Sequence, residues 1–273
     1  MRRDFLVVTA LGSASFLTAW SGSAAIAAPN FDWAGPYVGA SVGLNAPASP
    51  TSLTFPYSAS NYLTFVGNAP QRVDIGGYTP FGTLPTSVMP YAPLIGTFSA
   101  GLNQQNGAIV FGLEADASFS ASAKYKFTNS GEELTVSGGM ESLFTLRPRI
   151  GVAVDRLLLF GTGGLAVGQA KFDTSLHLAD NGKGTGVDSA DWSGSNSAWK
   201  TGFTVGGGAE YAGSDKLSVK FEALYYNLGS IDVTATGSGQ GLAPHTGALD
   251  ATPYTGTMQL QGAVARGGVT FHM

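Results

Sequence analysis

The charged side chains of this chain are few and regularly spaced, and the chemistry open to them is ion pairing. Arg147 and Arg149 are two residues apart, and so are Glu114 and Asp116. Side chains of a β-strand repeat with a period of two, so each pair lies on one face of its strand. That face lies either in water or inside a closed barrel whose outer surface contacts lipid. The surrounding elements decide between these two arrangements.

Two other patterns resemble cofactor-binding or catalytic motifs, but their contexts argue against both. The stretch Gly161–Ala166 (GTGGLA) fits a dinucleotide-binding pattern, with Asp180 at a suitable distance. No helix can follow it, because the next residues read as strand and loop, and we interpret the glycines as curving a sheet. The stretches Ser197–Lys200 and Lys200–Gly202 resemble two serine-acylase motifs, yet they share Lys200, whereas the enzymes place these motifs on separate elements. We therefore predict no nucleotide site and no catalytic residues.

Histidines and acidic residues are the remaining candidates for bound metal or haem. The chain has three histidines and no cysteine, which excludes disulfides, thiolate metal sites and cysteine nucleophiles. His177 and His245 fall in two predicted loops and could approach each other, although solvated loop histidines are the simpler interpretation. The acidic residues Asp180, Asp188 and Asp191 lack the spacing of a calcium-binding loop. We predict no cofactor and no metal ion.

The composition favours tightly packed strands or a membrane surface. Charged residues make up 12% of the 273 residues, against about 25% in ordinary soluble domains. Glycine is abundant, at 39 residues, and the chain has 16 Phe, 10 Tyr and 4 Trp. The sequence has no basic patch, so nucleic acid is not an expected partner.

The first 27 residues have the pattern of a cleaved signal peptide. Arg2 and Arg3 give a positive start, a mostly apolar stretch covers residues 5–20, and Ala25–Ala27 offers small residues to a signal peptidase. The apolar stretch is shorter than the about 20 residues that a transmembrane helix needs. We predict a signal peptide followed by a mature domain at 28–273, with ordinary secretion favoured over the twin-arginine export that the two arginines leave open.

Eight segments of the mature chain alternate as half-buried strands do. The stretch Leu143–Gly168 predicts a hairpin with its turn at Val154–Arg156. The predicted strands cover 33–44, 94–103, 108–120, 143–154, 157–168, 200–211, 217–225 and 257–273. The connections alternate between long ones, at 46–93, 128–138, 174–198 and 236–254, and short ones, at 104–107, 154–156 and 212–216.

This alternation is typical of an outer-membrane barrel with short periplasmic turns and long external loops. We therefore predict an all-β fold, an eight-stranded antiparallel transmembrane β-barrel. The long first external loop, 46–93, could fold over the barrel as a lid or extend the strands beyond the membrane. Five aromatic residues could form girdles at the membrane interfaces, unless they pack elsewhere: Trp33, Tyr37, Tyr211, Tyr225 and Tyr226.

The polar strand faces carry balanced charge. A soluble eight-stranded barrel encloses an apolar face, but Leu157–Val167 has no charge on either face and fits a wall that contacts lipid. The charged faces then lie inside, where an unpaired charge is very costly. We predict a paired lumen charge network, and hence a plugged lumen, made of four acidic and four basic residues: Glu114, Asp116, Glu210, Glu222, Arg147, Arg149, Lys220 and Arg266.

Six segments carry a resemblance to a known family: Trp33–Gly39, Phe111–Asp116, Leu146–Gly151, Phe160–Ala166, Val205–Tyr211 and Val219–Glu222. They are similar to the small outer-membrane β-barrel proteins of alpha-proteobacteria, which include porin-family, outer-membrane immunogenic and opacity-type surface proteins. The resemblance implies an outer-membrane location, a surface-exposed role and no catalytic residues. Such barrels usually end in an aromatic residue that the assembly machinery reads, whereas this chain ends in Met273, with Phe271 two residues before it.

The functional prediction is a structural, surface-exposed outer-membrane barrel that performs no catalysis. Its expected partners are outer-membrane lipid, lipopolysaccharide and the outer-membrane assembly machinery. Two alternatives remain open. One is a narrow porin-like channel for small solutes, and the other is an adhesin or haem-binding protein that holds an external ligand through its loops.

Overall fold

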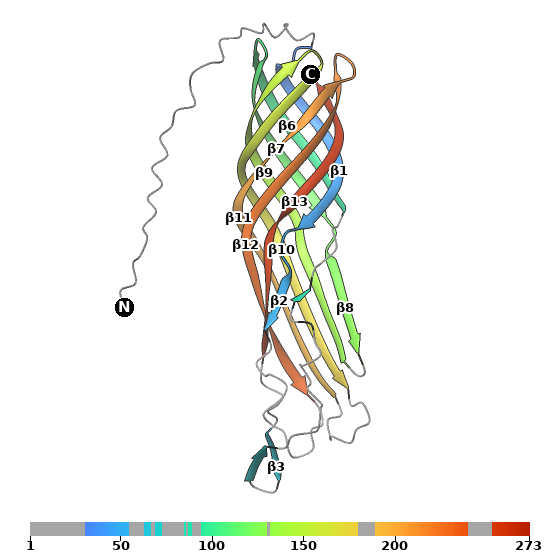
Figure 1. Ribbon diagram of the computed structural model, residues 1–273, viewed down its shortest axis with the longest axis vertical. Coiled ribbons are helices and arrows are strands. Elements are labelled where there is room, and N and C mark those ends of the chain that lie inside the picture. Colours follow the sequence, from blue (N-terminus) through green and yellow to red (C-terminus); the bar gives the residue numbers. More distant parts are fainter. Residues whose placement is uncertain are drawn as a thin grey trace, which may run out of the picture.

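Eight antiparallel strands form a closed ring in the computed structural model, which describes residues 31–54, 63–66, 69–72, 85, 87–88, 94–129, 132–179, 189–239 and 253–273 (Figure 1). Each strand pairs with the next, and the last pairs with the first from Tyr37↔His272 to Pro47↔Gly262. The predicted eight-stranded barrel is confirmed. Its strands are β1 (Gly35–Pro47), β6 (Leu94–Asn106), β7 (Ile109–Ser120), β9 (Glu132–Val154), β10 (Leu157–Ala179), β11 (Ser189–Ala212), β12 (Leu217–Gly239) and β13 (Tyr254–His272).

Five shorter strands lie at the end with the long connections, and three of them add to the sheet of the ring (Figure 1). They are β2 (Thr51–Thr54), β3 (Leu63–Val66), β4 (Ala69–Arg72), β5 (Ser87–Val88) and β8 (Ala123–Asn129). Strand β2 pairs with β13 and β5, β8 pairs with β9, and β3 and β4 form a separate hairpin. The segment 46–93 is therefore not one plain loop, because β1 runs into it and four short strands lie within it. The predicted signal peptide lies outside the described residues.

Short turns close the opposite end of the barrel at the three predicted places. Gly107 follows β6 at φ 60° and Asp155 follows β9 at φ 53°, the left-handed conformation that tight hairpins use. The chain ends at this same end, where the backbone N–H of Met273 donates to the carbonyl of Pro36 over 3.1 Å. Among the described residues, no helix is long and apolar enough to cross a membrane.

The strands extend well beyond the predicted bounds, so the predicted loops 128–138 and 174–198 were largely wrong. Of the predicted loop 236–254, β12 covers residues 236–239 and β13 begins at Tyr254, whereas residues 240–252 lie outside the described part of the chain. Strand β9 already begins at Glu132, and β10 continues to Ala179. One cause is a set of three register shifts, at Gln169/Ala170 between β10 and β9, at Ser193/Phe203 between β11 and β12, and at Asn227/Ser230 between β12 and β13. Each shift breaks the period of two that reveals a strand in sequence. The other cause is composition, because the outer surface there is rich in Ser, Thr, Gly and Asp.

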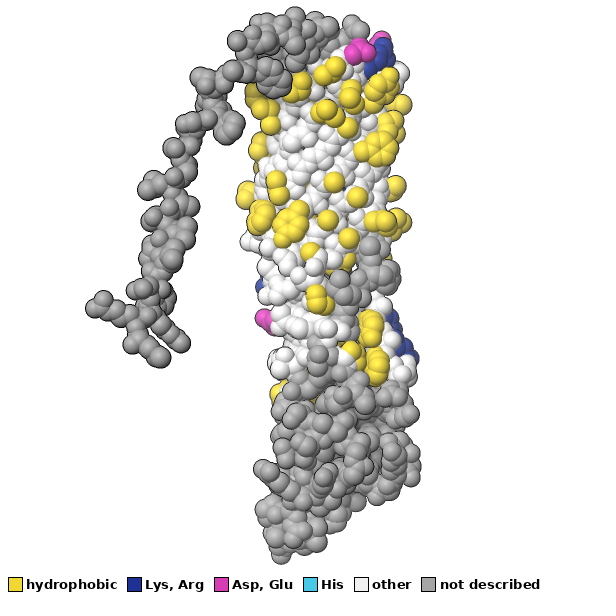
Figure 2. Space-filling view, in the orientation of Figure 1, with side chains coloured by type: hydrophobic (Ala, Val, Ile, Leu, Met, Phe, Trp, Pro, Cys, Tyr) yellow, Lys and Arg dark blue, Asp and Glu magenta, His cyan; other side chains and the backbone are white. Residues whose placement is uncertain are grey.

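An apolar belt surrounds the half of the barrel that carries the short turns (Figure 2). On β10 it runs from Leu157 to Val167, a rise of about 33 Å along the strand and about 25 Å along the barrel axis at the usual tilt of roughly 40°. That height matches the apolar band of a transmembrane barrel. Its exposed side chains include Leu44, Phe98, Phe111, Leu146, Leu165, Phe203, Phe221 and Val269.

Beyond the belt the polarity of the wall reverses. The outward positions of β10 become Gln169, Lys171, Asp173 and Ser175, whereas the inward positions, apart from Thr174, become apolar. The inward side chains form one buried cluster that includes Leu134, Phe172, Leu176, Trp192, Ile231, Val233 and Tyr254. We call this part the outer extension: residues 132–143, 168–179, 189–198, 227–239 and 254–262. It has an apolar core and a polar surface, as a soluble barrel does.

Candidate functional site: the charged lumen

The eight charged residues of the predicted lumen network all point into the barrel within the belt. Each is at most 5% exposed, and Arg147 is fully buried. The sequence places them there because each stands between two outward neighbours of a strand whose alternate residues face the lipid. The eight charges sum to zero, as four carboxylates and four cations. They are Glu114 and Asp116 on β7, Arg147 and Arg149 on β9, Glu210 on β11, Lys220 and Glu222 on β12, and Arg266 on β13.

Arg147 lies at the centre of the network. Its Nη2 donates to Glu114 and Asp116, each over 2.7 Å, and its Nη1 donates to Glu222 over 2.8 Å. Its Nε donates to the hydroxyl of Thr145 over 3.0 Å. Strand β12, which carries Glu222, is separated from β9 by two strands in the ring. The Arg147–Glu222 pair therefore crosses the lumen.

Arg266 binds two of the same carboxylates, those of Asp116 and Glu222, from the other side. Its Nη2 contacts Glu222 over 2.5 Å and Asp116 over 3.0 Å, and its Nε donates to Glu222 over 2.8 Å. Its Nη1 donates to the hydroxyls of Thr97 and Ser118. Two carboxylates are thus held between two guanidiniums, the donor geometry that gives strong charge-assisted hydrogen bonds.

Arg149 and Lys220 form a second layer nearer the short turns. The Lys220 Nζ lies 2.8 Å from Glu114, which is on the opposite wall. Arg149 contacts Glu210 over 3.1 Å and Glu114 over 3.4 Å. Its guanidinium also lies over the rings of Tyr37 and Phe160, at 5.1 and 4.6 Å from their centroids. These distances are within the range of cation–π attraction.

Several uncharged members of the network were not predicted. The Tyr37 hydroxyl donates to Glu114 over 2.8 Å, and the Ser218 hydroxyl donates to Glu210 over 2.5 Å. His272 Nε2 lies 3.3 Å from Glu210 and 2.9 Å from the Ser218 hydroxyl. Tyr37 and His272 each stand next to an outward apolar residue, Val38 and Phe271, so the alternation of their strands would have identified both as inward residues.

Of the five aromatic residues considered for interfacial girdles, three pack inside the barrel, the alternative that the sequence left open. Trp33, Tyr37 and Tyr226 are buried inside the barrel, whereas Tyr211 and Tyr225 face outward. The inward ones fill space that the small barrel leaves beside its polar groups. The Tyr226 hydroxyl, for example, donates to Asn45 over 2.9 Å.

Apolar layers lie on both sides of the charged layer. At the short-turn end, Phe31 and Trp33 pack with Val110, Leu158 and Phe160. The Trp33 backbone N–H donates to the Gln105 side chain over 2.7 Å, which fixes this segment across the barrel end. On the other side begins the apolar core of the outer extension. The charges are therefore shielded from bulk water at both ends.

The arrangement does not resemble a catalytic site. Ser218, His272 and Glu210 are close together, but the serine and the carboxylate both contact Nε2 of the histidine, whereas a nucleophilic triad uses its two ring nitrogens separately. Within the described part of the chain, no group of three His, Asp or Glu side chains could hold a metal ion.

The other sequence motifs lie in regular strands. Gly161–Ala166 is part of β10, so no helix follows it, and Ser197–Lys200 is part of β11. His177 lies on β10, not in a loop, and its Nδ1 is 2.6 Å from a carboxylate oxygen of Asp191 on β11. His245, Asp180 and Asp188 lie outside the described residues.

Comparisons with known proteins agree with this architecture. The family model described as an outer membrane protein beta-barrel domain matches residues 14–246. The 31 kDa outer-membrane immunogenic protein of Brucella melitensis is 31% identical over 212 residues, 76% of this chain and 77% of the relative. The 22 kDa outer membrane protein of Rhizobium leguminosarum bv. viciae is 30% identical over 141 residues, 50% of this chain and 54% of the relative.

Among solved structures, the outer membrane protein OprG from Pseudomonas aeruginosa covers 90% of this chain and 99% of its own, at 12% identity and a TM-score of 0.45. Ail, the attachment invasion locus protein of Yersinia pestis, covers 85% of this chain and 99% of its own, at 13% identity and a TM-score of 0.31.

Proposed function

Because this chain belongs to the outer membrane β-barrel family and is an outer-membrane protein, we propose that it is a non-enzymatic structural barrel with a plugged lumen that displays its outer extension at the cell surface. The observation that carries the proposal is that two ion pairs cross the lumen. Arg147 joins Glu222 over 2.8 Å, and Lys220 joins Glu114 over the same distance.

Opening such a lumen would be costly. An eight-stranded barrel is just wide enough to be filled by its own side chains. Each crossing pair would have to separate, and breaking a buried pair costs about 3–5 kcal/mol. The apolar layers around Trp33 and Phe172 would also have to move, because they lie on either side of the charges.

Conductance across a planar lipid bilayer tests the proposal. The refolded barrel should give no steady single-channel current under conditions in which an added porin conducts. Steady current steps would contradict the plugged lumen and support the narrow channel for small solutes. The double variant Arg147→Ser with Glu222→Ser removes one crossing pair without changing the net charge. It should show more single-channel current than the wild type.

The expected partners belong to the same proposal. The apolar belt is the surface for outer-membrane lipid and lipopolysaccharide. For the assembly machinery, Phe271 is the candidate terminal signal, because it is 46% exposed on the belt although Met273 ends the chain. Replacing Phe271 with Ser should lower the amount of barrel that reaches the outer membrane, whereas replacing Met273 with Ser should have a smaller effect. An equal effect of both would refute this assignment.

A further inference from the structure

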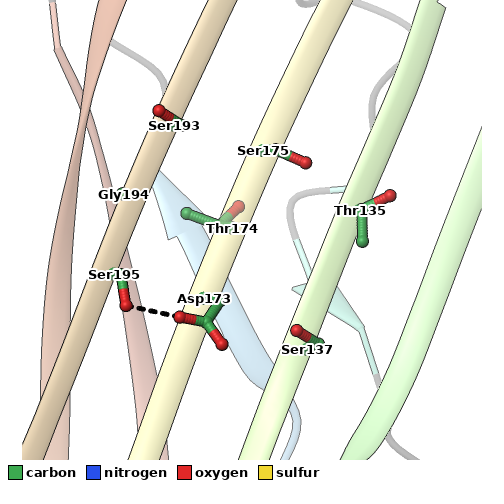
Figure 3. Close-up of a pocket in the computed structure, with 8 residues that line it drawn as sticks. All are labelled: Thr135, Ser137, Asp173, Thr174, Ser175, Ser193, Gly194 and Ser195. Atoms are coloured by element: carbon green, nitrogen blue, oxygen red, sulfur yellow. Dashed lines mark hydrogen bonds between the residues drawn. The ribbon is translucent and has the colours of Figure 1, made fainter.

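A shallow hollow lies on the outer surface of the outer extension, away from the lumen (Figure 3). Its volume is about 400 Å³, near the lower end of the roughly 300–1,000 Å³ of small-ligand sites. Two cross-strand rows form it on β9, β10 and β11: Thr135, Ser175 and Ser193 in one row, and Ser137, Asp173 and Ser195 in the next. We call these six residues the hydroxyl hollow.

The hollow exists because its own side chains are short and longer ones lie in the rows beside it. Lys171 lies in the adjacent row towards the membrane, between the small residues Gly139 and Ser197. The next row outward holds Glu133, His177 and Asp191. Lys171 on the membrane side and the outer row of Glu133, His177 and Asp191 on the other side therefore border a depression on an otherwise regular sheet.

The carboxylate of Asp173 is held in a fixed direction by two neighbours. One carboxylate oxygen of Asp173 accepts a hydrogen bond from the Ser195 hydroxyl over 2.5 Å (Figure 3). The other carboxylate oxygen lies 3.3 Å from the Lys171 ammonium. The remaining hydroxyls, from Thr135, Ser137, Ser175 and Ser193, can both donate and accept. A carboxylate amid hydroxyl groups is complementary to the vicinal hydroxyls of a saccharide.

The height of the hollow above the membrane selects the kind of ligand. The belt ends on β10 at Val167, so Lys171 lies about 10 Å and Ser175 about 20 Å above it along the barrel axis, at 3.3 Å per residue and a tilt of roughly 40°. Phospholipid headgroups extend only about 5–8 Å beyond the hydrocarbon on each side. They therefore stop short of the hollow, whereas the sugar chain of a glycolipid reaches it.

The geometry points to a binding site for the saccharide portion of an outer-leaflet glycolipid. The acyl chains of that lipid lie against the belt below the hollow, around Val167 and Phe144, and its sugars lie in the hydroxyl hollow. The site is continuous with the lipid-contacting surface, so one molecule can occupy both. This assignment rests on the outer-membrane location and on the surface display proposed above, and it does not depend on whether the lumen conducts.

Native mass spectrometry of the refolded barrel released from micelles measures this binding. The probes are lipopolysaccharide with core sugars, lipid A without core sugars, free core oligosaccharide, and phosphatidylglycerol. Ser175→Tyr fills the hollow, and Asp173→Asn removes its charge. Thr255→Tyr is the matched control, because Thr255 is an exposed outward residue of β13 in the same extension. The heat-dependent shift of each variant on a gel confirms that it has folded.

The wild type should retain lipopolysaccharide about tenfold more tightly than Ser175→Tyr and Asp173→Asn do, a loss of about 1.4 kcal/mol. Thr255→Tyr should bind as the wild type does, and all four proteins should hold lipid A equally through the belt. Equal retention of lipopolysaccharide by every variant would refute the site. Binding of free core oligosaccharide without any preference for the lipid-linked form would refute the glycolipid and leave a soluble saccharide as the ligand. Bilayer conductance tests the plugged lumen separately.

Discussion

Replacing Arg147 with Leu removes the side chain on which the lumen charge network converges. The guanidinium is fully buried and contacts three carboxylates at 2.7, 2.7 and 2.8 Å. Its loss leaves an excess negative charge in the lumen, and breaking a buried pair costs about 3–5 kcal/mol. Arg266 still holds Asp116 and Glu222, so the effect should fall near the lower limit, at about 3 kcal/mol.

Urea unfolding of the barrel in lipid vesicles, followed by tryptophan fluorescence, measures this loss. Arg156→Leu is the matched control, because Arg156 lies in a turn and its partner Asp215 is 3.9 Å away with 96% of its side chain exposed. An exposed pair contributes only about 0–1 kcal/mol. Equal midpoints for the wild type and Arg147→Leu would refute the reasoning, because the arginine would then not be a buried partner of these carboxylates.

Three further predictions concern the rest of the barrel. Phe172→Ala should lower the free energy of unfolding by about 3–5 kcal/mol, because the ring is fully buried in the extension core, and limited proteolysis should then cut the extension first. Burial raises the pKa of Tyr254 to about 12 from 10.0. The stability that the neutral phenol contributes is therefore complete below pH 10 and is lost as the pH rises to 12. Over this range the free energy of unfolding of the wild type should fall by an amount on the order of 2–3 kcal/mol, whereas that of Tyr254→Phe should not fall in this way. Gly164→Val should reduce the folded yield on a heat-shift gel, since a Cβ there would lie 2.2 Å from the carbonyl oxygen of Leu146, whereas Gly161→Val, with its nearest atom at 4.0 Å, should fold normally.

Each of these predictions has an outcome that contradicts it. The first is contradicted if Phe172→Ala is protease-resistant and as stable as the wild type. The second is contradicted if the wild type and Tyr254→Phe lose stability in parallel between pH 10 and 12. The third is contradicted if Gly164→Val and Gly161→Val fold with the same yield, because the close approach of β9 and β10 would then not be required.

The strand-level pattern of the barrel was predictable from sequence, but the partners inside it were not. Alternation alone assigns Glu210 and Lys220 to the inward face, and they are direct neighbours in the register of β11 and β12. Lys220 nevertheless contacts Glu114 on the far wall, whereas Glu210 is held by Arg149. Those pairings depend on the stagger of the closed ring, which no single strand reveals.

The outer extension shows a different limit of sequence reasoning. His177 was assigned to a loop, because its surroundings are rich in Asp, Ser and Gly, yet it lies on β10 opposite Asp191 of β11. The alternation continues through Phe172 and Leu176, but the inward face is now the apolar one. A search for strands that are apolar outside misses such a segment, since the environment of each face has changed at the membrane boundary.

The reversal at this boundary also explains how eight buried charges are tolerated. Coulomb attraction grows as the surrounding dielectric falls, so an ion pair is stronger where water is excluded. The cluster around Trp33 at one end and the core around Phe172 at the other exclude water from the charged layer between them. The core of the outer extension therefore has two effects. It holds the surface hydroxyl hollow at a fixed height above the lipid, and it strengthens the cross-lumen pairs by keeping the barrel closed above them.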